Sequence, residues 1–153
     1  MKIKSLITKN NGNSNTSTLL TSEFRPTPEF EHLFEWVRLG ASHVRKNVAC
    51  IEEHRQSLRS RGETEKRLSE LDRWRQSFAF TDREKAALDL SQTISLHEPE
   101  ELGCLILKEA QLHFNTHQIV RLTLTVLAVN DWIDFHAKSH DPICDDFLQQ
   151  SPS

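Results

Sequence analysis

Apolar residues recur every three or four positions along most of the chain from residue 30 to residue 133. This spacing is typical of helices that bury one face, and it continues with few interruptions. The segments that we expect to be helical are 30–44, 47–61, 63–74, 81–94, 102–114 and 115–133. The last of them is apolar on most sides, which predicts a central position in the fold. The pattern therefore predicts an all-α helical bundle.

Three of these segments begin with residues that favour a helix start. Asn47 precedes the second segment, where its side chain can accept a hydrogen bond from a free backbone N–H. Thr81 and Glu84 form a capping-box pattern, and Asn115 with Gln118 can act in the same way. The helix starts are therefore predicted more firmly than the helix ends.

The two ends of the chain lack this periodicity. Residues 9–18 contain no apolar side chain, and the segment after Asp141-Pro142 is weakly patterned. We therefore expect a flexible polar N-terminal arm at 1–25, one helical domain at 26–141 and a C-terminal tail at 142–153.

Composition supports this organisation and excludes several classes of protein. The 153 residues suffice for one domain, and four glycines, five prolines and no tyrosine argue against a turn-rich all-β fold. The net charge of −3 gives no basic face for nucleic acid, and no apolar stretch is long enough to span a membrane. No glycine-rich loop that could cradle a nucleotide is present, so we expect no cofactor.

Cysteine content indicates the compartment. Cys50, Cys104 and Cys144 are odd in number and widely spaced, unlike the cysteines of a secreted disulfide scaffold. The N-terminus also turns polar too soon for a signal peptide. We therefore expect reduced thiols in a cytoplasmic protein.

The second helical segment contains the residues best suited to chemistry. Cys50 and His54 are four positions apart and so share one face of a helix. If Asn47 caps this helix, Cys50 lies in its first turn, where the helix dipole favours a thiolate. Glu35, folded back against His54, would fix the tautomer of the imidazole. A buried cysteine can equally be a small hydrophobic residue, so the spacing alone leaves both interpretations open.

A metal site is a weaker alternative. Cys50, His54, His136 and His140 could in principle supply four zinc ligands from two helices. No Cys-x-x-Cys pair supports such a site, and His140 lies next to a predicted helix end. We therefore expect no bound metal.

Several blocks of the sequence, taken in order, resemble the alkylhydroperoxidase D (AhpD)/carboxymuconolactone decarboxylase family. The resemblance covers about residues 28–138, and the ordered series is more specific than any one block. The blocks are 35–42 (EWVRLGAS), 50–54 (CIEEH), 62–68 (GETEKRL), 74–75 (WR), 80–88 (FTDREKAAL) and 128–132 (AVNDW).

The resemblance implies an AhpD-like helical fold that assembles into a homo-oligomer, a trimer or a hexamer. In the thiol-active branch of that family, a Cys-x-x-Cys-x-x-x-His motif reduces peroxides, and a glutamate twelve residues before the first cysteine assists the histidine. Glu35 stands at the glutamate position, Cys50 at the second cysteine and His54 at the histidine. The second cysteine is the one that attacks peroxide.

This chain departs from the family motif at its first cysteine. Asn47 occupies that position, and Ala49 stands where a relay histidine is sometimes found. The internal disulfide of the motif therefore cannot form. An oxidised Cys50 would need a small thiol, a partner protein, or Cys104 or Cys144 to resolve it.

The leading hypothesis is an AhpD-like peroxidase or thiol oxidoreductase with a single active-site cysteine. In it, Cys50 attacks a peroxide, His54 activates the thiol and Glu35 orients His54, while the thiol reductant is not specified. One alternative is a member without activity that serves as an oligomeric binding or regulatory scaffold. The other is acid–base chemistry of the decarboxylase type, in which Glu35 and His54 handle protons.

Overall fold

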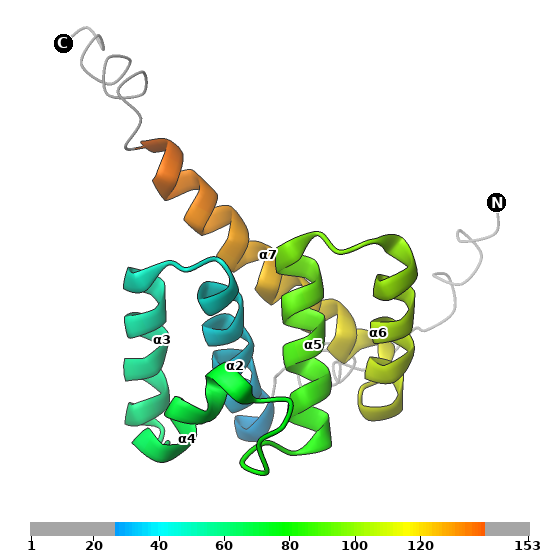
Figure 1. Cartoon of the computed structure of the whole chain (residues 1–153), viewed down its shortest axis with the longest axis horizontal. Coiled ribbons are helices and arrows are strands. Elements are labelled where there is room, and N and C mark those ends of the chain that lie inside the picture. Colours follow the sequence, from blue (N-terminus) through cyan, green and yellow to red (C-terminus); the bar gives the residue numbers. More distant parts are fainter. Residues whose placement is uncertain (1–26, 140–153) are drawn as a thin grey trace, which may run out of the picture.

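The computed structural model describes residues 27–139, and within that range it contains six α-helices, one 3₁₀ turn and no strand. The all-helical prediction is confirmed. Figure 1 shows the helices as an open bundle, with α3 at one end and α6 at the other. The elements in chain order are α2 (Pro28–Val44), α3 (Val48–Ser60), α4 (Glu65–Ser69), η1 (Glu70–Arg73), α5 (Asp82–Leu96), α6 (Glu100–His113) and α7 (Thr116–Ser139).

Helix α2 is the centre of the bundle, because it packs against α3, α5 and α7. Its two apolar faces enter different clusters of buried side chains. Phe34 and Val37 belong to a cluster shared with α5, α6 and α7, whereas Trp36 and Leu39 belong to one shared with α3, α4 and η1. A helix with a buried residue on nearly every side can hold a polar side chain away from water, which matters for Glu35.

One position on α2 leaves little room for a side chain. A Cβ atom added at Gly40 would lie 3.0 Å from Leu88 Cδ2 on α5. Close by, the Ser91 hydroxyl donates a 3.0 Å hydrogen bond to the backbone oxygen of Val37. These contacts bring α5 tightly against the middle of α2.

The predicted helix starts are confirmed. The Asn47 side chain accepts a hydrogen bond of 2.9 Å from the backbone N–H of Cys50 and so caps α3. The capping box of Thr81 and Glu84 is complete on α5. Asn115 accepts from the backbone of Gln118 at 2.9 Å, and its own N–H donates to the Gln118 side chain. Such caps use only residues three apart, so the sequence suffices to find them.

The expected central position of the last helix is wrong. One face of α7 is buried, but Val120, Leu124, Leu127, Trp132 and Phe135 are exposed on its other sides. Helix α6 is similar, since Leu102 and Leu105 on it are exposed. An apolar periodicity shows that a face avoids water, but it does not show whether this chain or another molecule covers that face.

The predicted segment 63–74 also differs in detail. It forms the five-residue α4 followed by the 3₁₀ turn η1, rather than a single helix. The expected arm at 1–25 and tail at 142–153 lie outside the described residues. None of the helices in the described range has the length and apolar content needed to cross a membrane.

Candidate functional site

A carboxylate from α2 and an imidazole from α3 meet inside the bundle. Glu35 Oε2 lies 3.3 Å from His54 Nδ1, and the second carboxylate oxygen pairs with the guanidinium of Arg38, one turn further along α2. Glu35 is only 6% exposed. The contact arises because α2 packs along α3, and it has the arrangement that the sequence predicted for these two residues.

The carboxylate of Glu35 stays ionised at neutral pH. Burial by itself would raise its pKa, but the hydrogen bonds from His54 and Arg38 and the charge of Arg38 outweigh burial and lower the pKa to about 2. An ionised carboxylate can only accept hydrogen bonds, so Nδ1 of His54 carries the proton. The other ring nitrogen, Nε2, is then the one that can accept a proton.

Cys50 lies in the first turn of α3, close to the start of the helix. Its backbone N–H is bound by the Asn47 side chain, and the residue is buried, with 7% of its surface exposed. Within residues 27–139, no hydrogen bond joins the Cys50 thiol to the His54 imidazole. Proton transfer between the two would therefore need a closer approach or a bridging water once a substrate is bound.

The expectation that the start of the helix favours a Cys50 thiolate is wrong. Burial raises the pKa of the Cys50 thiol, and the carboxylate of Glu53, one turn further along α3, raises it again. The Asn47 side chain already binds the backbone N–H group of Cys50, and the first turn of α3 contains no basic residue. The thiol is therefore protonated at rest, and a base must activate it during a reaction.

Two neighbouring cavities reach Cys50, and their linings share Cys50, Glu53 and Trp132. The smaller, of about 200 Å³, is lined by Cys50 and His54 together with Arg38, Glu53 and residues of α7. The larger, of about 480 Å³, lies between the start of α3 and the C-terminal half of α7, and we name it the α3–α7 groove. Its lining comprises Asn47, Ala49, Cys50, Glu53, Trp132, Ile133, His136 and Ala137. Figure 1 shows the orange half of α7 running past this end of the bundle.

A third depression, of about 700 Å³, lies elsewhere. It is lined by residues at the starts of α2 and α5, among them His32, Arg83 and Glu84. His32 faces Glu63 at 3.6 Å, and Arg83 lies over the rings of Phe30 and Phe114, so the polar groups there have structural partners. It contains no thiol. We therefore place the candidate site at Cys50.

Sequence reasoning missed three residues of this site, Arg38, Glu53 and Trp132, and it connected His136 with Cys50 only in the metal hypothesis. Arg38 is three positions after Glu35 and Glu53 three after Cys50, so helical spacing could have identified both. Trp132 and His136 are brought to Cys50 only by the packing of α7. No local pattern in the sequence connects them with the second helix.

The weaker metal hypothesis gains no support. No group of three or more His, Cys, Asp or Glu side chains within residues 27–139 is placed to hold a metal ion. His54 and His136 line different cavities beside Cys50, while His140 lies outside the described range.

Cys104 does not complete a thiol pair at this site. Cys104 is exposed on α6, and Figure 1 shows α6 at the opposite end of the bundle from α3. Cys144 is outside the described residues. An internal disulfide between Cys50 and Cys104 is therefore not compatible with this fold.

Comparison with known proteins supports the sequence resemblance. The family model for the carboxymuconolactone decarboxylase family matches residues 31–93, a segment that contains Glu35, Cys50 and His54. The uncharacterized protein YdfG of Bacillus subtilis (strain 168) is 30% identical over 98 residues, which are 64% of this chain and 67% of that protein. The Trp132–His136 side of the α3–α7 groove lies outside the segment matched by the family model.

A solved structure shares the fold. The crystal structure of a protein of unknown function from Agrobacterium tumefaciens, named as a candidate antioxidant defence protein AhpD, superposes with a TM-score of 0.61. The two chains are 20% identical, and the match covers 90% of this chain and 86% of the other. At this identity the likeness shows a common fold.

Proposed function

Because the chain belongs to the carboxymuconolactone decarboxylase family and has an AhpD-like fold, we propose that it is a thiol-dependent peroxidase with one active-site cysteine, Cys50. The observation that carries the proposal is the shared cavity of Cys50 and His54, with Glu35 bound to the far side of the imidazole. A thiol, a base and a carboxylate that orients the base thus follow one another, which is the arrangement that activates a cysteine nucleophile.

The protonation states define the first step. The Cys50 thiol is neutral at rest, so a peroxide that enters the cavity meets an S–H group, and His54 lines the same cavity. Its Nε2 removes the thiol proton after a closer approach or through a bridging water. The ionised Glu35 stabilises the resulting imidazolium. The sulfur then attacks one peroxide oxygen, and the O–O bond breaks. Cys50 becomes a sulfenic acid, and the peroxide is reduced to an alcohol or to water.

The absence of the first motif cysteine determines how the enzyme is regenerated. Asn47 cannot attack the sulfenic acid, and Cys104 is at the other end of the bundle. In the proposed cycle an external thiol condenses with the sulfenic acid, releasing water and leaving a mixed disulfide. A second thiol releases Cys50 by exchange. We place this cycle in the cytoplasm, where reduced thiols are abundant.

Trapping of the sulfenic acid tests this proposal. The reduced protein with Cys104→Ser and Cys144→Ser is mixed with one equivalent of peroxide and dimedone, and its intact mass is measured. We expect one dimedone adduct, absent when Cys50→Ser is added. A protein that keeps its reduced mass through this treatment would overturn the peroxidase proposal and favour the scaffold alternative.

A second function is favoured by one observation: the pKa of Cys50 is raised in the cavity that it shares with His54, whose imidazole contacts the ionised Glu35. In this case His54 would act as an acid–base catalyst on a lactone or keto acid and would not need the thiol. Activity on such a compound that survives Cys50→Ser and disappears with His54→Gln would support this function. Loss of activity in Cys50→Ser would exclude it.

We also propose that the protein is a homo-oligomer. Support comes from the exposed apolar side chains of α6 and α7, which the described part of the chain does not cover. Those with at least 40% of their surface exposed on these two helices are Leu102, Leu105, Leu107, Leu112, Val120, Leu124, Leu127, Trp132 and Phe135. A second copy of the same chain can bury such a surface on both partners at once.

A further inference from the structure

Among the described residues, His136 lacks the carboxylate partner that four other histidines have. Within residues 27–139, no side chain forms a hydrogen bond or an ion pair with the His136 ring. Four other imidazoles each face a carboxylate: His32 with Glu63 at 3.6 Å, His43 with Asp72 at 3.0 Å, His54 with Glu35 at 3.3 Å and His113 with Glu109 at 3.6 Å. The nitrogens of His136 therefore remain available to a ligand.

The position of the His136 ring is nonetheless well defined. It stands nearly perpendicular to the Trp132 ring, with centroids 4.1 Å apart and an interplanar angle of 73°. The Phe135 ring lies 5.9 Å from the His136 ring at an interplanar angle of 82°. Aromatic contacts of this kind restrict an imidazole without using its nitrogens. The ring is thus oriented, and it lines the α3–α7 groove together with Cys50 and Glu53.

The peroxidase reaction needs two proton transfers at different places. The thiol proton must leave the sulfur, and the oxygen released from the broken O–O bond must gain a proton if it departs as an alcohol. His54 lines the smaller cavity, whereas His136 lines the α3–α7 groove, which also reaches Cys50 and has room for an organic peroxide. Histidine is the side chain best suited to give and take protons near neutral pH.

We propose that His136 is the general acid that protonates the leaving oxygen of a peroxide bound in the α3–α7 groove. This role rests on the proposed peroxidase function. His54 removes the proton of Cys50, the sulfur bonds to the terminal O–H oxygen, and the O–O electron pair passes to the other oxygen. That oxygen takes a proton from the His136 imidazolium, so the products are Cys50 sulfenic acid and an alcohol. The imidazolium of His54 then returns one proton to solvent, and His136 regains one.

Two peroxides with different leaving groups test this role. Cumene hydroperoxide releases an alkoxide, which needs a proton, whereas 3-chloroperbenzoic acid is of similar size and releases a carboxylate, which does not. Single-turnover oxidation of Cys50 by each compound is followed by stopped flow in the full chain with Cys104→Ser and Cys144→Ser. The variants are His136→Gln, His54→Gln and the control His113→Gln on the surface of α6.

We expect His136→Gln to slow the reaction with cumene hydroperoxide by about 100-fold, the usual size of a general-acid contribution. Its reaction with the peracid should remain within about twofold of wild type. His54→Gln should slow both reactions, because both need an activated thiol, and His113→Gln should slow neither. In His136→Ala, added imidazole should restore the reaction with cumene hydroperoxide but leave the peracid rate unchanged.

Other outcomes would overturn the inference. Equal slowing of both peroxides by His136→Gln would show a structural role, and unchanged rates would show no role. In either case the wild-type protein still reacts, so the peroxidase proposal survives. A wild-type protein that reacts with neither compound would overturn the peroxidase function itself.

Discussion

Glu35 and His54 belong to different helices and are 19 positions apart in the chain, yet Glu35 Oε2 lies 3.3 Å from His54 Nδ1. The contact fixes the imidazole so that Nε2 is the basic nitrogen. It also keeps a buried carboxylate ionised, since Arg38 and His54 together offset the cost of burial. The geometry therefore couples the stability of the bundle to the chemistry proposed for Cys50.

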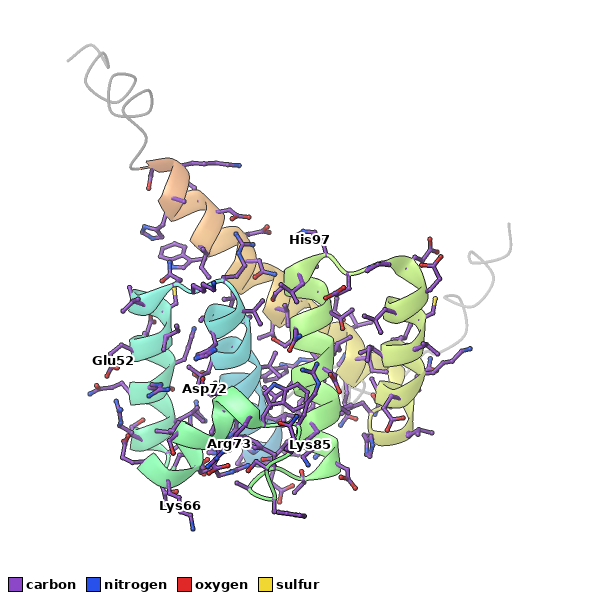
Figure 2. All side chains as sticks on the ribbon, viewed as in Figure 1. Glu52, Lys66, Asp72, Arg73, Lys85 and His97 are labelled. Atoms are coloured by element: carbon purple, nitrogen blue, oxygen red, sulfur yellow. The ribbon has the colours of Figure 1, made fainter. Side chains whose placement is uncertain are left out.

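Replacing the Glu35 carboxylate should lower both the stability of the bundle and the reactivity of Cys50. In Glu35→Gln, Arg38 and His54 lose a charged partner inside the bundle, and we expect the free energy of unfolding to fall by about 1–3 kcal/mol. Cys50 oxidation should slow by about tenfold or more, because the imidazolium loses its counter-charge. Urea unfolding and stopped flow measure the two effects. Glu52→Gln is the matched control, because Glu52 points away from the bundle (Figure 2) and forms an exposed pair with Arg59. Equal losses in both variants would contradict this role for Glu35.

The same carboxylate predicts a dependence of stability on pH. The pKa of Glu35 is about 2 in the folded protein and 4.5 as its ordinary value, so folding lowers it. A lowered pKa stabilises the fold above pH 4.5, and this stabilisation disappears as the pH falls from 4.5 towards 2. The difference in unfolding free energy between wild type and Glu35→Gln should therefore shrink over this range. A difference that stays constant from pH 6 down to about pH 2.5 would contradict the lowered pKa.

Glu53 should keep the thiol protonated. Its carboxylate raises the pKa of Cys50, so Glu53→Gln should lower that pKa and make alkylation faster near neutral pH. Because Glu53 is exposed, we expect roughly a two- to threefold increase in the rate with iodoacetamide, measured in the background without Cys104 and Cys144. Glu52→Gln, one position away, serves as the control. A slower reaction in Glu53→Gln would contradict the electrostatic role.

Asn47 is expected to have a structural role where the family motif has a cysteine. Its side chain accepts the Cys50 N–H at 2.9 Å. Asn47→Ala should lower the free energy of unfolding by about 1 kcal/mol, and Asn47→Asp, which keeps the cap, should not. Thermal unfolding followed by circular dichroism measures both. If alanine and aspartate behave alike, the cap does not contribute to stability.

The oligomer proposal has a direct test on α7. Leu124 is 59% exposed, so a charge there should be harmless to a monomer and disruptive to an assembly that buries it. We expect Leu124→Glu to reduce the mass measured by light scattering after gel filtration, while Lys66→Glu on α4, away from the exposed apolar side chains of α6 and α7, leaves it unchanged. A wild-type protein of 17.7 kDa in this experiment would show that the chain is monomeric.

The features predicted correctly from the sequence depend on residues that are close in the chain or share one helix face. The caps at Asn47 and Thr81 are of this kind, because a cap is formed within one helical turn. The pairing of Glu35 with His54 depended on the family resemblance as well as on helical spacing. Both residues lie on helices that the sequence predicts, at the positions of the glutamate and the histidine of the family motif.

The features that the sequence did not predict depend on packing. The pKa of Cys50 is raised by its burial, whereas the sequence showed only its place near a helix start. The apolar residues of α7 could not be divided into buried and exposed sets, because Leu122 and Leu124 look alike in a periodic pattern. Trp132 and His136 reach Cys50 only through the path of α7.

The most direct test of the account is the second-order rate constant for oxidation of Cys50 by hydrogen peroxide, compared with free cysteine at the same pH. We predict that wild type exceeds free cysteine by about 100-fold or more and that His54→Gln loses most of this advantage, since the base activates a thiol that is protonated at rest. A wild-type rate at or below that of free cysteine would contradict the proposal that Cys50 is a catalytic thiol.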